Sequence, residues 1–80
     1  MLIERLSSLA HEQWSGWMRY LFSKCTTNED GTMTIPKWAV ERWTRQMNTP
    51  YGQLPESERE SDRHEARRMI AVMTTAKEEG

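Results

Sequence analysis

The chain has 80 residues, with four tryptophans, six methionines, one cysteine and a formal net charge of −1. This length supports only a small core and predicts a single domain over residues 1–80, and the near-zero charge argues against a protein that binds nucleic acid mainly by neutralising phosphates. The lone Cys25 cannot form an internal disulfide, which predicts a cytoplasmic protein. No membrane segment is expected because there is no long apolar stretch, and no secretory signal is expected because the start carries Glu4 and Arg5.

The first predicted helix runs over about residues 2–24, where apolar side chains recur at helical spacing. Its stripe contains Ile3, Leu6, Ala10, Trp14 (or Gln13), Trp17 and Leu21. Tryptophans on such a stripe are more often core residues than stacking platforms, so Trp14 and Trp17 are expected in the core. Met18, Tyr20 and Phe22 make the second half of the helix apolar nearly all round. That half is predicted to contact more than one partner surface.

A change of composition near residues 26–35 predicts a short β-hairpin. Turn-forming residues end in Asp30-Gly31, and the β-favouring run 32–35 follows them. A calcium-binding loop is the alternative for a glycine in this position. Its frame would place Thr26 and Lys37 where acidic ligands are required, so it is discounted.

The second predicted helix covers residues 36–47 and starts at Pro36, whose missing N–H is harmless in a first turn. Its apolar side carries Ala39, Val40, Trp43 and Met47. Trp38, Arg42 and Arg45 share another face at i, i+4 and i+7. Because Trp38 lies off the apolar side, two interpretations stay open: it stacks on a ligand or partner, or it packs within the domain.

The third predicted helix covers residues 55–76, after a connector at 51–54 that follows Pro50. Its expected buried stripe comprises Ala66, Met69 or Ile70, and Met73. One turn toward the N-terminus the same stripe reaches Asp62 and then Arg59 or Glu58. Either these charges are solvated or paired beyond the core, or Asp62 and one or two arginines line a polar pocket.

Arginines on the third helix form a second pattern. Arg59, Arg63 and Arg67 fall at i, i+4 and i+8, a stripe whose ordinary role is a solvated face but whose geometry also suits phosphate. Phosphate is not expected at the start of this helix, because Glu56 and Glu58 occupy it and would repel an anion.

Two segments carry a family resemblance: residues 10–14 (AHEQW), and residues 50–59 (PYGQLPESER) followed by Asp62-Arg63 and an apolar helix. They resemble the ryanodine-receptor repeat domain (RyR domain), which shows a hydrophobic-His-Glu-x-Trp helix, then Pro-Tyr-x-x-Leu-x-Glu-x-Glu-Lys, then a helix. The resemblance covers the first and third helices. The Gly-Trp-x-Tyr-Gly segment that usually follows the first helix is absent, and residues 22–43 replace it.

The resemblance implies a small helical binding module of the prokaryotic or phage type. In it, the motif residues His11, Glu12, Trp14, Trp17 and Leu54 are structural, Tyr51 packs in the core, and His11 hydrogen-bonds the turn around Tyr51. Solitary RyR-like domains are associated with nucleotide-signalling immune systems. A phage version would act as an anti-defence sponge in the cytoplasm of an infected bacterial host, sequestering a cyclic ADP-ribose isomer or a cyclic oligonucleotide.

Such a ligand requires aromatics to stack a base, arginines to bind phosphates, and a carboxylate for ribose hydroxyls or an exocyclic amine. The predicted ligand-binding residues are Trp38, Arg42, Arg45, Tyr51, Arg59, Asp62 and Arg63. No catalytic residue, metal or cofactor is expected. His11 and His64 lack further ligands at metal-binding spacing, and the serines lack a convincing partner for nucleophilic catalysis, so the chain is predicted not to be an enzyme.

Two other function classes stay open. The first is a phage-encoded protein-interaction module that inhibits a host protein, and the second is DNA binding through the second helix. A sponge predicts a concave site where Trp38 or Tyr51 meets two arginines, an inhibitor a flat or convex apolar patch, and a DNA-binding protein a continuous basic face. Self-association into a homo-oligomer is expected because the first helix has more apolar surface than three helices can cover.

Overall fold

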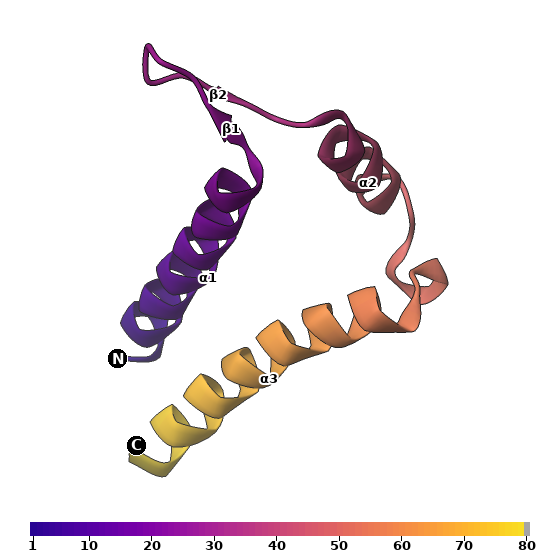
Figure 1. The fold of residues 1–80 in the computed structure, drawn as a ribbon. Helices are drawn as coiled ribbons and strands as arrows, with labels where there is room; N and C mark the ends of the chain where they lie inside the picture. The colour runs from indigo at the N-terminus through magenta and orange to yellow at the C-terminus, as the bar shows by residue number, and fades with distance from the viewer. Residues whose placement is uncertain (80) are drawn as a thin grey trace.

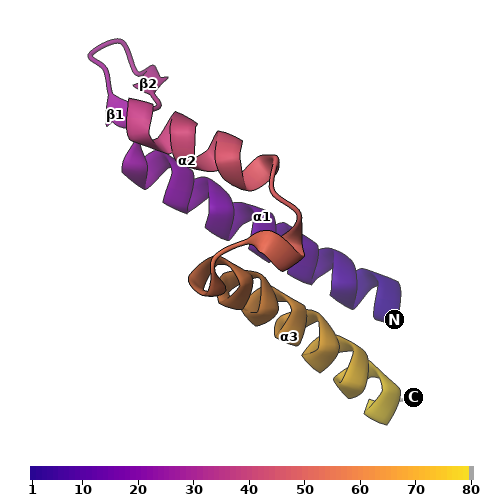
Figure 2. The same ribbon diagram turned by 90° about the vertical axis from the view of Figure 1, so that its right-hand side faces the viewer.

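A computed structural model describes the backbone of residues 1–79 and the side chains of residues 1–75. The elements are α1 (Leu2–Lys24), β1 (Thr26–Thr27), β2 (Met33–Thr34), α2 (Lys37–Met47), a short 3-10 helix η1 (Tyr51–Gln53) and α3 (Glu56–Glu79). The predicted three-helix domain with a short hairpin is confirmed. Helices α1 and α3 run antiparallel, side by side, with both chain termini at one end (Figures 1 and 2). In the described residues no helix is long and apolar enough to cross a membrane.

Prolines set the starts of α2 and α3. The carbonyl of Pro36 accepts the backbone N–H groups of Ala39 and Val40 at 3.0 and 3.1 Å, and Pro55 does the same for Glu58 and Arg59. Each proline therefore stands just before its helix, one residue outside the predicted position. At its other end α3 continues three residues beyond the predicted limit, to Glu79.

The hairpin pairs Thr26 with Thr34 and Thr27 with Met33 in antiparallel register. Gly31 has φ +88°, a conformation that side-chain-bearing residues rarely adopt. The carboxylate of Asp30 accepts hydrogen bonds from the hydroxyl and the backbone N–H of Thr32, at 2.6 and 3.0 Å. These bonds, the hydroxyl first, hold the pKa of Asp30 below its ordinary value.

The core is very small. Among the described side chains only Leu9 and Ala39 are buried, at 6% and 0% exposure. Leu9 lies outside the predicted stripe of the first helix. Trp14 and Trp17, expected in the core, are 59% and 44% exposed, so that expectation is wrong. The face that α1 turns toward α3 is rotated by about one residue from the predicted stripe.

The contact between α3 and α1 is more polar than predicted. Gln13 donates hydrogen bonds from Nε2 to the carbonyl and the carboxylate of Glu65, both at 3.2 Å. The guanidinium of Arg68 donates to Glu12 at 3.1 Å. The predicted buried stripe of α3 is instead exposed, and its members are Ala66, Met69, Ile70 and Met73. That prediction is wrong because α3 presents to α1 the side that carries Glu65 and Arg68.

Candidate functional site: a groove between the three helices

A groove of about 830 Å³ lies between α1, α2 and α3, the helices seen in Figure 1. One wall is aromatic and carries Trp17, Tyr20 and Trp43, while Met47 and Leu54 add aliphatic surface. The remaining lining is mostly polar and charged. The volume falls in the range of about 300 to 1,000 Å³ that is usual for ligand pockets.

The aromatic wall is built from two helices. Trp17 and Tyr20 are three residues apart on α1, so they lie on one face, and their rings stack with centroids 5.5 Å apart. Trp43 of α2 meets Trp17 edge-on at 5.3 Å and Tyr20 at 6.4 Å. Such ring pairs contribute about 0.5 to 1.5 kcal/mol beyond the area they bury. They fix α2 against α1 and leave ring surface facing the groove.

Carboxylates outnumber guanidinium groups in the polar lining, which contains Glu12, Glu58, Asp62 and Glu65 against Arg42 and Arg68. Arg68 is engaged, since it forms ion pairs at 3.1 Å with Glu12 and with Glu65. Asp62 has no hydrogen-bond or ion-pair partner among the described residues. Because Arg45, outside the lining, pairs with Glu58, the groove carries an excess of one negative charge, and Asp62 is its one carboxylate without a partner among the described residues.

The predicted face of Trp38, Arg42 and Arg45 is divided by the structure. The Arg42 guanidinium lies 5.2 Å from the centre of the Trp38 ring, a cation–π distance. Arg42 lines the groove, whereas Trp38 does not. Arg45 turns to α3 and donates two hydrogen bonds to Glu58, at 2.6 and 3.3 Å. The bond from Arg45 is the main cause that lowers the pKa of the Glu58 carboxyl.

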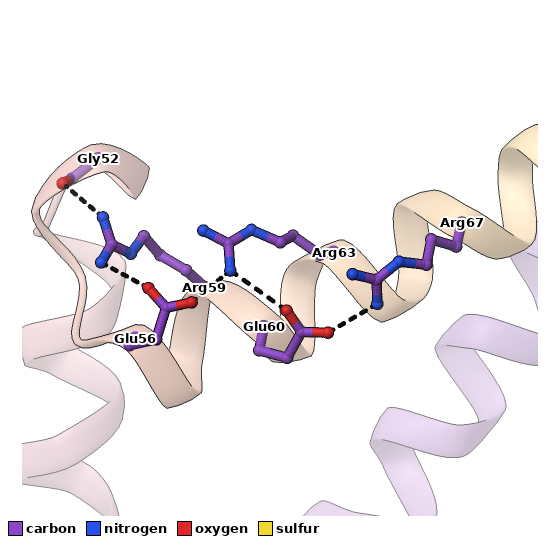
Figure 3. Close-up of polar contacts among 6 residues, drawn as sticks. All are labelled: Gly52, Glu56, Arg59, Glu60, Arg63 and Arg67. Carbon is purple, nitrogen blue, oxygen red and sulfur yellow. Dashed lines mark hydrogen bonds and ion pairs between the residues drawn. The ribbon is translucent and has the colours of Figure 1, made fainter.

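The arginine stripe of α3 is interleaved with glutamates (Figure 3). Glu56 binds Arg59 at 2.7 Å and Arg63 at 2.5 Å, and Glu60 binds Arg63 at 3.2 Å and Arg67 at 2.7 Å. We call these five residues the arginine ladder. Hydrogen bonds from Arg63 and Arg67 lower the pKa of Glu56 and Glu60, respectively. Two glutamates offset two of the three arginine charges, so the ladder does not form a continuous basic face.

Two of the predicted ligand-binding residues, Arg42 and Asp62, line the groove. The other five lie outside its lining: Trp38, Arg45, Tyr51, Arg59 and Arg63. Asp62 therefore lines the groove with Arg42 and Arg68, without contacting either of them, and not with the arginines of the ladder. Asp62 is an exposed residue that lines the groove, so its role in binding stays a prediction.

The motif residues are also distributed. Glu12, Trp17 and Leu54 line the groove, but Trp14 does not. Tyr51, expected in the core, is half exposed. His11 was expected to bond the turn around Tyr51, yet its Nε2 lies 3.4 Å from the hydroxyl of Ser15, one turn along α1. That expectation is wrong, because His11 has no hydrogen bond to that turn among the described residues.

Sequence reasoning did not assign Tyr20, Trp43 or Arg68 to a binding site. The signal for the first two was the surplus of apolar side chains in the second half of α1, which predicted more than one partner surface. No pattern pointed to Arg68, because its role depends on how α3 is rotated against α1.

In the described residues no group of three or more histidine, cysteine or acidic side chains could hold a metal ion. No protein-family model, curated protein or solved structure matches this chain. The resemblance to the RyR domain stays a prediction.

Proposed function

We propose that the chain is a non-catalytic binding module whose groove takes a protein segment with apolar and basic side chains. The composition of the groove supports this most: an aromatic wall faces a lining in which four carboxylates oppose two guanidinium groups. Apolar side chains would pack on the rings, and a lysine or arginine would be attracted by the acidic excess. An amphipathic helix combines both features, which makes it the expected form of the ligand.

Individual side chains fit this role. Asp62 is available for an incoming cation because it has no partner among the described residues. Met47 is largely exposed at the edge of the groove, and methionine adapts to apolar side chains of varied shape. The partner would be a protein that the module inhibits, such as a host enzyme.

A nucleotide-derived signal is the second candidate ligand, as the RyR resemblance implies. The observation that favours it is that Arg42 and Asp62 share the groove with three aromatic rings. A base would stack on a ring, Asp62 would accept from ribose hydroxyls, and Arg42 would bind phosphate. The negative excess works against an anionic ligand, and we rank this candidate second. The internally paired arginine ladder gives no support to DNA binding.

A displayed library of random helical peptides tests the first candidate. Selection on the full chain is expected to enrich peptides that carry basic residues on one side and apolar residues on the other. Asp62→Lys should weaken the selected peptides about fivefold, as expected for loss and reversal of one partly exposed charge. Glu29→Lys makes the same change of charge in the hairpin, outside the groove, and should leave affinity unchanged.

Titration with cyclic ADP-ribose isomers and cyclic dinucleotides in a calorimeter separates the two candidates. An anionic nucleotide predicts the opposite effects of the two substitutions. Arg42→Ala should weaken its binding because a phosphate contact is lost, whereas Asp62→Lys should not weaken the electrostatic attraction because it adds positive charge. For a basic peptide, Arg42→Ala should leave the binding affinity unchanged or increase it. If no peptide is enriched and no nucleotide binds more tightly than about millimolar, both candidates are wrong.

A further inference from the structure

An apolar face runs along α1 and α3 outside the groove. On α1 it contains Ile3, Ala10 and Trp14, and on α3 it contains Ala66, Met69, Ile70 and Met73. All seven are exposed, with Ile3 and Ile70 each at 60%. None of them lines the groove. We call this set the open face.

Both halves of the open face lie on the same side of the helix pair. Ala10 follows the buried Leu9, and Met69 follows Arg68, which contacts Glu12 of α1. One residue turns a helix by about 100°, so each half is rotated in the same sense from the contact, viewed from its own N-terminus. Because α1 and α3 run antiparallel (Figure 2), equal rotations bring the two halves to one side.

The whole chain exposes more surface than a compact monomer of its mass. The accessible area is 6365 Å², whereas a compact monomer of 9.5 kDa exposes about 5,000 Å². The excess of about 1,300 Å² is more than the roughly 800 Å² that each partner buries in a standard stable interface. The radius of gyration agrees, at 16.3 Å against about 12 Å for a compact chain of this length.

The chemistry of the open face indicates which partner covers it. Its seven members are uncharged, so they can meet in two copies without mutual repulsion, and the first charge along the α3 stripe is Asp62, one turn before Ala66. Two antiparallel helices of 23 and 24 residues with a shared apolar face are one half of a four-helix bundle. A two-fold axis supplies the other half, because such an interface joins the same surface on both chains.

We propose that two copies of this chain pair through the open face and form a four-helix bundle from α1 and α3 of each. Helix α2 and the hairpin remain outside the bundle. The groove is lined by other residues, so the dimer and the proposed ligand are compatible and can fail independently.

Sedimentation equilibrium of the full chain tests this dimer. The expected mass is twice the 9.5 kDa of one chain. Ile70→Glu should give monomers, because the charge would be buried on both sides of the two-fold axis. Val40→Glu is the matched control, since Val40 is a similarly shaped, 49% exposed residue of α2 outside the open face. This control should remain dimeric.

A milder change guards against loss of folding. Ile70→Ala should keep its helical circular dichroism and raise the dimer dissociation constant at least about tenfold, because each dimer loses the side chain twice. A wild-type chain that stays monomeric at every concentration overturns the proposal. A dimer whose dissociation constant is unchanged by Ile70→Ala also overturns the proposal, because pairing would then use another surface. This outcome counts whether or not Ile70→Glu folds.

Discussion

At the scale of residues, the charged side chains of α3 mainly satisfy one another. Each ladder glutamate binds the arginines three and seven positions later, which follows from the helical repeat. The sequence predicted the arginine stripe and left two roles open for it. Which role the arginines take depends on how far neighbouring side chains reach. The carboxylates of Glu56 and Glu60 lie close enough to form ion pairs with these arginines.

Lower pH should destabilise the fold through these carboxylates. Arginine hydrogen bonds hold the pKa of Glu56, Glu58 and Glu60 below the ordinary value of 4.5. A group with a depressed folded-state pKa contributes its stability above the unfolded value, and loses it as pH falls through the folded value. The midpoint of thermal unfolding, followed by circular dichroism, should therefore be constant near neutrality and fall below about pH 4.5.

The matched control replaces both ladder glutamates, as Glu56→Gln with Glu60→Gln. This variant should start less stable and decline less steeply in acid, because two of the linked carboxyls are gone. A midpoint that rises on acidification, or an identical decline in the variant, would show that the ladder does not stabilise the fold.

At the scale of elements, the helices were predictable and their rotations were not. Pro36 and Pro55 marked two starts, Asp30-Gly31 marked the hairpin, and helical periodicity gave the rest. The buried faces were missed because apolar residues cover a wide arc of α1, and a shift of one residue, from Ala10 to Leu9, moves the contact by about 100°. The residues that line the groove depend on how α1 and α3 are rotated against each other. The polar wall of the groove could therefore not be predicted from the sequence.

Two glycines give opposite predictions for element stability. Gly16 lies inside α1 with nothing within 4 Å of an added Cβ, so Gly16→Ala should stabilise the chain by up to about 1 kcal/mol. Gly31 also has free space but φ +88°, so Gly31→Ala should destabilise it by about 1 to 2 kcal/mol. Urea unfolding at one fixed protein concentration compares the two free energies.

Equal effects from the two substitutions would contradict this account, because free space alone would then decide both outcomes. Gly52→Ala is a useful third variant. It has free space and no positive φ, so it lacks the strain expected at Gly31.

At the scale of the whole molecule, the chain is thin and incompletely packed, with extents of 50 × 34 × 16 Å. Two buried side chains among the described residues are few for a folded domain, and the groove and the open face are two of the surfaces that expose apolar side chains. The groove combines rings with an acidic excess, and the open face is uncharged. That difference in chemistry is the reason to assign a ligand to one and a second copy to the other.

The four tryptophan indole N–H signals of the 15N-labelled chain test this assignment most directly. Trp17 and Trp43 line the groove, Trp14 lies on the open face, and Trp38 lies outside both. Adding a selected peptide should shift the signals of Trp17 and Trp43 and leave Trp14 in place, whereas dilution of the free chain should shift Trp14. A ligand that shifts the signal of Trp14 or Trp38 and leaves the signals of Trp17 and Trp43 unchanged would contradict the assignment of the groove as the binding site.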